Sequence, residues 1–388
     1  MTAFDTIVVA DWSAGKRRPA RPSKDAIWLG VARSGVPDDP IYCRSRQEAE
    51  DRIARIIDTE QAAGRRLLVS FDFPFGYPRG VARHITGVDD PFALWDWISA
   101  RITDAPDGSN NRYAVAEEMN AHFDGLGPFW GKPNQTDWPG VPYRKAGISY
   151  DTVPERRACD LAAKAASSCF QLAFPPTVGG QILMGLPTLN RLRARPGVAV
   201  WPFQDWGNAP VVLAEIWPGL IEPAVKAVPS DDIRDAVQVK LLATALSRLS
   251  PETLHGWMTD LPEAAQEEAW ILGAGQAETL SSYAEEKRQG KPLKNDCFAL
   301  PPGVHWTPVD EALADLRTRL SCVVGTENVT VAAALDRILA SDVAAPRAHP
   351  PLPNTAVDGY GFLNGRGEGD HHIPLVAQHM PAGATPDA

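Results

Sequence analysis

Short apolar runs rich in β-branched residues constrain the fold of this chain more than any other feature. Thr6–Ala10 (TIVVA) and Leu67–Phe71 (LLVSF) are too short for core helices and are typical of buried strands. Apolar residues recur at helical spacing in the segments between such runs. Strands that alternate with helices in this way predict an α/β fold. The predicted strands are Thr6–Ala10, Ala26–Ala32, Leu67–Phe71 and Val211–Trp217, and the predicted helices are Arg46–Ala62, Glu155–Phe170 and Asp231–Leu249.

The distribution of tryptophan divides the chain into two parts. A length of 388 residues predicts two or three domains. Eleven of the twelve tryptophans lie at or before Trp270, and the last is Trp306. The intervening segment is charged and ends in a proline pair, as a linker would. We therefore predict a first domain at 1–280, a linker at 281–304 and a second region at 305–388.

Composition and charge exclude several classes of protein. The apolar share of 44% and the charged share of 22% are those of a globular protein, not of a fibrous or disordered one. A net charge of −10 argues against a protein that coats nucleic acid, although it allows a local basic groove. No apolar run reaches the roughly 18 residues of a transmembrane helix, and the five cysteines lack metal or disulfide spacing. We expect a cytoplasmic protein with reduced thiols and no membrane partner.

Four carboxylates fall at or near the ends of the predicted strands and helices of the first domain. Asp11 and Asp72 directly follow two apolar runs, Glu215 lies inside a third, and Asp235 lies in a predicted helix. Open α/β sheets bind ligands at the carboxyl ends of their strands, so these acids are expected to converge there. Converging carboxylates repel one another unless a cation neutralises them, and oxygen ligands select Mg²⁺ or Mn²⁺. Two such ions about 4 Å apart can activate water against a phosphodiester.

Each acid also has a purely structural interpretation. Asp11 and Asp72 precede turns that their side chains could stabilise. Glu215 could instead pair with an arginine such as Arg157. Asp235 lies one turn inside the predicted helix, where capping would not explain it.

Two further segments carry features of a phosphate-binding surface. Five cations follow Asp11 closely, and they form either a solvated loop or a phosphate clamp beside the acids. The long irregular segment 125–150 combines aromatic and basic residues, which suits a functional loop. Together they would fit a phosphate-containing small molecule or a single-stranded nucleic acid. The five cations are Lys16, Arg17, Arg18, Arg21 and Lys24.

Five short blocks in the first domain occur in an order that is familiar. They are Asp11-Trp-Ser-Ala-Gly, VSFDFPFGYP around Asp72, RRACD ending at Asp160, AEIWPGL around Glu215 and Asp235-Ala-Val. Over about residues 5–275 the chain resembles an uncharacterised family of RNase H-like proteins that are labelled predicted nucleases. The resemblance implies an RNase H-like fold, with Asp11, Asp72 and Asp235 at positions that hold metal in active relatives.

The region after the linker carries a more specific motif. Residues 307–345 predict two helices separated by a break at 324–329, and the extended block PPLPNTAVDGY follows from Pro350. From about 308 to 388 this region resembles the N-terminal part of the MoeA/gephyrin family, the molybdopterin molybdenumtransferases. The resemblance implies an α+β region in which Asp358 belongs to the active-site area, with Asn354 and Thr355 beside it. The local alternative is that this asparagine and aspartate only form turns.

The resemblances lead to two hypotheses of function. In the first, a molybdenum cofactor biosynthesis protein carries an N-terminal phosphoester hydrolase that depends on Mg²⁺ or Mn²⁺. The parent transferase would act on molybdopterin and molybdate and form a homodimer through its MoeA-like part. The chain stops before the molybdopterin-binding domain of that family, so we expect a truncated transferase. In the second hypothesis, the first domain is a non-catalytic module that binds a nucleotide or a partner.

Overall fold

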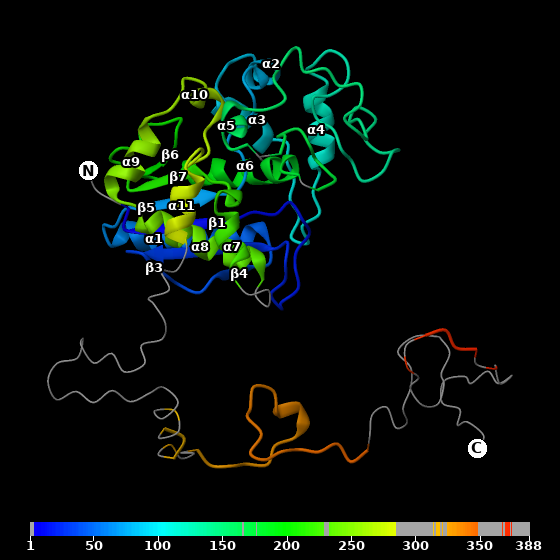
Figure 1. Ribbon diagram of the computed structural model, residues 1–388, viewed down its shortest axis with the longest axis vertical. Coiled ribbons are helices and arrows are strands. Elements are labelled where there is room, and N and C mark those ends of the chain that lie inside the picture. The colour runs from blue at the N-terminus through cyan, green and yellow to red at the C-terminus, as the bar shows by residue number, and fades with distance from the viewer. Residues whose placement is uncertain are drawn as a thin grey trace. The chain divides into compact units, whose positions relative to one another are not determined.

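The computed structural model divides into two compact units, residues 1–294 and 295–388 (Figure 1). In the first unit, the helix α11 (Ala277–Ala284) buries Leu280 and Ala284, so the packed part of the chain extends past the predicted end at 280. The rest of the predicted linker, 285–304, lies outside the described residues. The structure describes residues 4–164, 167–175, 177–228 and 233–284, and in the second unit 313, 316–318, 320, 324–347, 367, 369–372 and 374.

A seven-stranded sheet lies at the centre of the first unit. Its strand order is β3-β2-β1-β5-β7-β6, and β4 also pairs with β2. The strand β2 runs antiparallel to β1, whereas β1, β5, β7 and β6 are mutually parallel. The first unit is therefore a mixed α/β structure with a mostly parallel sheet. The strands are β1 (Thr6–Asp11), β2 (Ile27–Arg33), β3 (Val36–Pro37), β4 (Ile41–Cys43), β5 (Leu67–Phe71), β6 (Val198–Val200) and β7 (Val211–Glu215).

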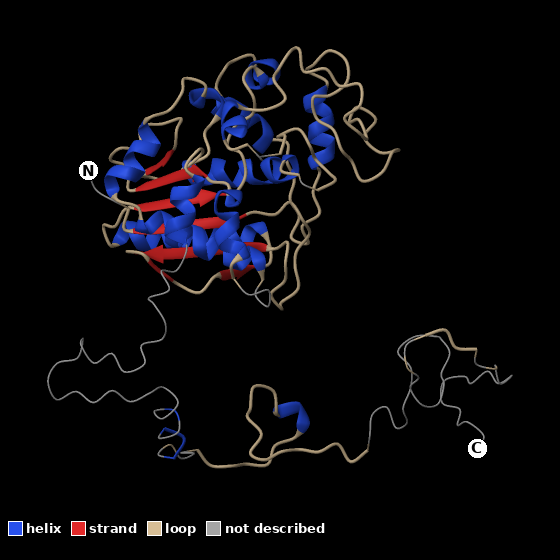
Figure 2. Cartoon of the chain, viewed as in Figure 1, coloured by secondary structure: helices blue, strands red, loops and turns tan. Residues whose placement is uncertain are grey.

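Helices cover both faces of this sheet. Alternation along β1 directs Val8 and Ala10 into one core and Ile7 and Val9 into the other. The first core also holds residues of α1 to α4 and α6, and the second holds residues of α7, α8, α9 and α11. Figure 2 shows the helices packed around the strands of the sheet. The remaining helices are α1 (Arg46–Ala62), α2 (Val81–Thr86), α3 (Pro91–Ser99), α4 (Arg112–Asn120), α5 (Ala158–Ala162), α6 (Gly179–Arg193), η1 (Pro218–Ile221), α7 (Glu222–Lys226), α8 (Arg234–Arg248), α9 (Pro251–Thr259) and α10 (Ala265–Glu268).

The helix α8 lies unusually close to β2. A Cβ atom on Gly30 would lie 2.1 Å from the carbonyl oxygen of Val239, a distance that no side chain tolerates. Glycine at this position lets the helix backbone rest directly on the strand. This contact fixes the path of α8 and, with it, the position of its first turn at the sheet.

Most of the elements predicted for the first unit are confirmed, and one of its predicted helices is wrong. The helix α1 and the strand β5 have the predicted limits, whereas α8 begins at Arg234 instead of Asp231. Of the helix predicted at Glu155–Phe170, the described residues form only α5. The backbone of Lys164 has a φ of 63°, which is left-handed and cannot continue an α-helix.

The segment 125–150 is irregular, as predicted, and some of its residues pack against the fold while much of it is exposed. Phe129 is fully buried in the first core. The buried Asn120 of α4 ties the segment down through hydrogen bonds to the backbone of Phe129 and Gly140. Lys132 is buried and donates to the carbonyl oxygens of Asp137 and Trp138 at 2.6 and 2.8 Å. These contacts give Phe129 and Lys132 a structural role, whereas the basic residues Arg144 and Lys145 are exposed.

The second unit differs from the prediction of two helices. Residues 324–347 contain one 3₁₀ turn, η3 (Val331–Ala333), and not the second predicted helix. The apolar residues of that segment are exposed, Val331 at 93% and Ile338 at 97%. An isolated helix gains too little without tertiary packing to persist in water, which explains the difference. The motif residues Asn354, Thr355 and Asp358 lie outside the described residues.

Candidate functional site

The sheet topology brings three of the predicted acids to one pocket. Because β1 and β5 are adjacent and parallel, Asp11 at the end of β1 and Asp72 after β5 lie at the same edge. Asp235, in α8, reaches the same edge through the packing of α8 on β1 and β2. All three line a pocket of about 390 Å³. The topology therefore brings Asp11, Asp72 and Asp235 together around one space.

Asp11 and Asp72 form a pair of carboxyl groups in contact. Burial is the main cause that raises the pKa of Asp11 well above its usual value, and the charges of Asp72 and Asp235 add to it. Burial also raises the pKa of Asp72 from 3.8 to about 7, against the opposing effect of a hydrogen bond from the Trp12 N–H. That N–H donates to Asp72 Oδ1 at 2.6 Å. A hydrogen bond between the two carboxyl groups completes the pair.

Asp235 occupies a different position in its helix from the one predicted. Because α8 begins at Arg234, Asp235 lies in the first turn, where the helix dipole favours an acid. Its Oδ2 accepts a hydrogen bond from the Asp25 N–H at 2.7 Å. Burial raises the pKa of Asp235, and this hydrogen bond opposes the rise. The side chain is thus both a favourable helix charge and part of the pocket wall.

Asp25 is a fourth acid of the pocket that the sequence reasoning missed. It lines the same space and contributes to the raised pKa of Asp11. The sequence feature that could have identified Asp25 is its position just before β2, because β2 pairs antiparallel with β1. In such a hairpin the start of the second strand lies beside the end of the first, so Asp25 had to lie near Asp11.

No basic side chain of the described residues neutralises these acids by an ion pair. The predicted clamp of five cations does not line the pocket, and most of its members are exposed. Arg18 is held instead by the carbonyl oxygen of Asp25, to which its Nε and Nη2 donate at 3.1 and 2.6 Å. The loop interpretation of this segment therefore describes it better than the phosphate clamp.

Amide and aromatic groups form the rest of the pocket wall. Gln181, in the first turn of α6, donates to the Trp12 carbonyl oxygen at 2.6 Å and so anchors the segment between Asp11 and Ser13. Gln238 lies one turn beyond Asp235 on α8. Trp217 follows β7 at the same edge of the sheet. The other lining residues are Ala26, Val178, Pro218 and Gly219.

Glu215 does not belong to this pocket, and its pairing with Arg157 is the interpretation that the structure bears out. Both side chains are buried, and the guanidinium binds both Glu215 oxygens at 2.6 and 2.7 Å. Arg157 also binds the buried Asp160, and the Phe75 N–H donates to Glu215. Burial raises the pKa of Glu215, and the Arg157 charge opposes that rise. Glu215 therefore acts in a buried ionic cluster and not among the pocket acids.

The pocket offers two carboxylates for a metal ion and not a complete protein cage. Within the described residues, no group of three or more histidine, cysteine, aspartate or glutamate side chains has the arrangement of a metal site. Mg²⁺, however, is commonly held by one or two carboxylates, with waters and substrate phosphates as the other ligands. The Asp11–Asp72 pair fits that donor set. A closed site made by Asp11, Asp72 and Asp235 together does not fit this geometry.

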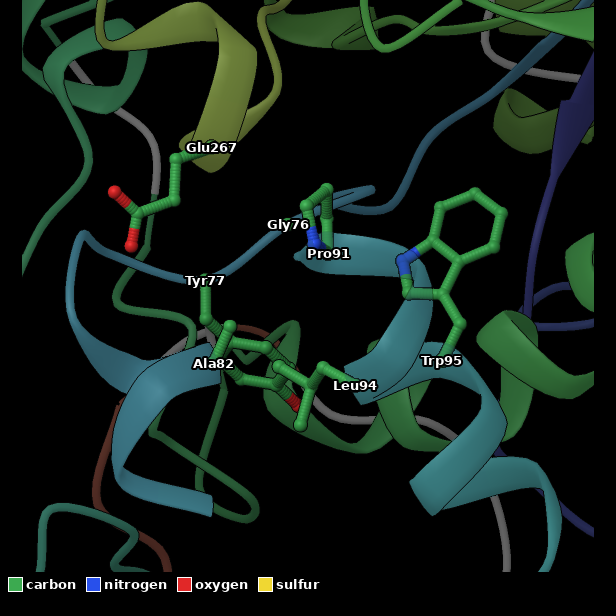
Figure 3. Close-up of a pocket in the computed structure, with 7 residues that line it drawn as sticks. All are labelled: Gly76, Tyr77, Ala82, Pro91, Leu94, Trp95 and Glu267. Carbon is green, nitrogen blue, oxygen red and sulfur yellow. The ribbon is translucent and has the colours of Figure 1, made fainter. Parts of the chain in front are cut away.

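Two other cavities are less suited to chemistry. One, lined by residues that include Tyr77, Trp95 and Glu267, has a volume of about 10 Å³, which holds about one water molecule (Figure 3). The second, of about 250 Å³, is largely apolar and borders Ile7 and Arg66 at the opposite edge of the sheet. Neither brings acids together as the pocket around Asp11 does.

None of the helices in the described part of the chain is long and apolar enough to cross a membrane.

The comparisons with known proteins concern the second unit. Neither the curated proteins nor the solved structures give a match to the chain. Residues 307–387, about a fifth of the chain, match the family model of the MoeA N-terminal region (domain I and II). This region of the chain is therefore related to proteins of molybdenum cofactor biosynthesis.

Proposed function

We propose that the first unit is a phosphoester hydrolase of RNase H-like fold that depends on Mg²⁺ or Mn²⁺. The observation that carries this proposal is the contact between two half-buried carboxyl groups, Asp11 and Asp72, without an ion pair to a basic side chain among the described residues. Buried like charges in contact are costly unless a proton or a cation neutralises them. A divalent ion held by this pair would supply that charge and, when bound, would activate water and polarise a phosphate.

The surrounding residues would orient the reacting groups. The Trp12 N–H donates to Asp72 Oδ1, and Gln181 donates to the Trp12 carbonyl oxygen. These two hydrogen bonds fix the orientation of the Asp72 carboxyl group beside Asp11. Asp235 keeps one oxygen on the Asp25 N–H, and its other oxygen could accept the proton of an attacking water. In this reaction the water oxygen bonds to phosphorus, the ester P–O bond breaks, and the leaving oxygen takes up a proton.

One observation favours a second candidate, a non-catalytic module that binds a nucleotide or a partner. The hydrogen bond between Asp11 and Asp72 means that one shared proton can neutralise the pair without any cation. In that case the acids would only shape the pocket. The two candidates differ in whether a divalent ion binds to the pair and in whether catalysis depends on it.

For the second unit, we propose that it is part of a molybdopterin molybdenumtransferase. The match over 307–387 supports this proposal. In such a transferase Asp358, with Asn354 and Thr355, would lie near bound molybdopterin and molybdate, and the unit would associate into a homodimer. Light scattering on the whole chain and on a chain that ends at Gly290 tests the association. A dimer of the whole chain and a monomer of the shorter chain is expected, and two monomers would contradict it.

Hydrolysis of bis(p-nitrophenyl) phosphate with Mn²⁺ or Mg²⁺ tests the proposed activity of the first unit. We expect metal-dependent hydrolysis that falls at least about 100-fold in Asp11→Asn and Asp72→Asn, because each loses a charged ligand. The matched control is Asp124→Asn, since Asp124 is exposed and does not line the pocket. Equal activity of the wild-type protein and Asp11→Asn would exclude the carboxylate mechanism.

A further inference from the structure

One wall of the acid pocket is aromatic, formed by Trp217, which comes two residues after β7. Trp217 is partly buried and lines the pocket together with Pro218 and Gly219 of η1. A Cβ atom on Gly219 would lie 2.2 and 2.4 Å from Cζ2 and Cε2 of the Trp217 indole. The indole therefore rests on the Gly219 backbone, a position that only glycine allows. This packing fixes the ring beside the pocket.

An amide with unused hydrogen-bonding capacity lies on the neighbouring element. Gln238 lines the pocket from α8, three residues after Asp235 and so on the same side of the helix. Within the described part of the chain, no side chain or backbone group forms a hydrogen bond with the Gln238 amide. A side-chain amide offers two donors and an acceptor, which can pair with the polar edge of a ligand.

The size and charge of the pocket limit the ligand that it can take. A volume of about 390 Å³ is near the lower end of the roughly 300–1,000 Å³ of small-molecule sites. Single-stranded nucleic acid needs a basic groove that follows its backbone. Acids line this pocket, and the five cations at 16–24 do not. The pocket therefore suits one small ligand better than a strand.

We propose that this pocket binds a nucleoside phosphate, with the base on Trp217, the base edge at Gln238 and the phosphate toward the Asp11–Asp72 pair. The flat ring, the unused amide and the acid pair that can hold a cation lie around one space of the right size. The phosphate end of this inference rests on the proposed function, because it needs a divalent ion to offset the acids. The base end rests on Trp217 and Gln238 alone.

Calorimetric titration with Mg²⁺ present tests the proposal. The ligands are AMP, GMP, CMP and UMP, with ribose 5-phosphate as the analogue without a base and a ten-residue oligothymidylate as the strand. We expect at least one nucleotide to bind about tenfold or more tightly than ribose 5-phosphate, the usual effect of stacking a base. Equal binding of ribose 5-phosphate and all four nucleotides, or tighter binding of the oligothymidylate, would overturn the proposal.

Variants assign the base preference to the aromatic wall. Trp217→Leu should abolish the preference over ribose 5-phosphate, and Trp217→Phe should keep part of it. Gly219→Ala should reduce it, because the new methyl group would displace the indole. The matched control is Trp257→Leu, a partly buried indole of α9 outside this pocket. If the folded Trp217→Leu variant still binds a nucleotide more tightly than ribose 5-phosphate, the proposal is contradicted. If that variant does not fold, an unchanged preference in Gly219→Ala contradicts the proposal instead.

Hydrolysis of bis(p-nitrophenyl) phosphate separates this inference from the proposed function. Metal-dependent hydrolysis without a nucleotide preference would overturn the nucleoside assignment and leave the hydrolase intact. A preference that depends on Trp217, without hydrolysis by the wild-type protein, would support the nucleoside assignment and refute the hydrolase.

Discussion

Two groups of acids lie at neighbouring strands of the same sheet, one buried and one half-buried, and among the described residues only the buried group forms an ion pair with a basic side chain. Glu215 ends β7 and shares Arg157 with Asp160, with all three side chains at most 3% exposed. Asp72 follows the adjacent strand β5 and meets Asp11, and backbone N–H groups are the main donors to this second group. The first group is a complete ion-pair cluster, whereas no basic side chain of the described residues forms an ion pair with the second.

The presence of an arginine in one group and its absence from the other indicate different roles for the two groups of acids. A buried carboxylate that receives a bidentate arginine is satisfied and has a structural role. A pair of carboxyl groups in contact must take up a proton or a cation, which connects it to the solution. The ionic cluster also supports the second group, because Glu215 accepts the Phe75 N–H in the turn that follows Asp72. One group therefore positions the chain that carries the other.

Removing the cation of the ionic cluster should have the largest effect. Arg157→Met would leave Glu215 and Asp160 buried without their partner, and loss of one partner of a buried ion pair costs about 3–5 kcal/mol. Urea unfolding measures this loss. The control is Arg83→Met, which breaks the exposed pair with Asp89 and should cost at most about 1 kcal/mol. Similar losses in both variants would refute the structural role of the cluster.

Amide substitutions should have opposite effects in the two groups. Glu215→Gln turns an NH₂ group toward the donors of Arg157 or Phe75, so we expect a loss of about 1–3 kcal/mol in unfolding free energy. Asp72→Asn can still accept the Trp12 N–H and can donate to Asp11, and it removes the repulsion. We expect it to increase stability at pH 8 without metal. Destabilisation of both by the same amount would remove the distinction.

The stability of the metal-free protein should fall as the pH rises from about 4 to about 7. The folded-state pKa of Asp72, about 7, is above its usual 3.8, so the folded protein binds the proton more tightly than the unfolded chain does. The protonated Asp72 contributes its full stabilisation below the unfolded-state pKa of 3.8. This stabilisation is lost as the pH rises toward the folded-state pKa of about 7. At about 1.36 kcal/mol per pKa unit, the loss is at most about 4 kcal/mol. Unfolding curves of the wild-type protein and Asp72→Asn measure it, and parallel pH profiles would refute it.

The comparison also shows how far sequence reasoning extends. Apolar runs followed by acids predict β1, β5 and the meeting of Asp11 with Asp72, because parallel neighbouring strands end at one edge. They do not distinguish Glu215 from these acids, since the arginine that pairs with it lies 58 residues away. The position of Asp25 at the pocket depends on the pairing of β1 with β2, and the position of the Trp217 ring depends on its contact with Gly219. These features arise from tertiary packing, which local patterns do not contain.

Binding of a divalent cation tests the central claim, that the acid pair lacks a positive charge, most directly. Calorimetric titration of Mn²⁺ and Mg²⁺ at pH 8 should give one or two sites in the wild-type protein and a large loss of affinity in the double variant Asp11→Asn/Asp72→Asn. The ion should also raise the melting temperature of the wild-type protein and not that of the double variant, since it binds only the folded pair. Glu215→Gln, folded under the same conditions, should keep the site. Absence of binding to the wild-type protein, or equal binding to the double variant, would contradict the claim.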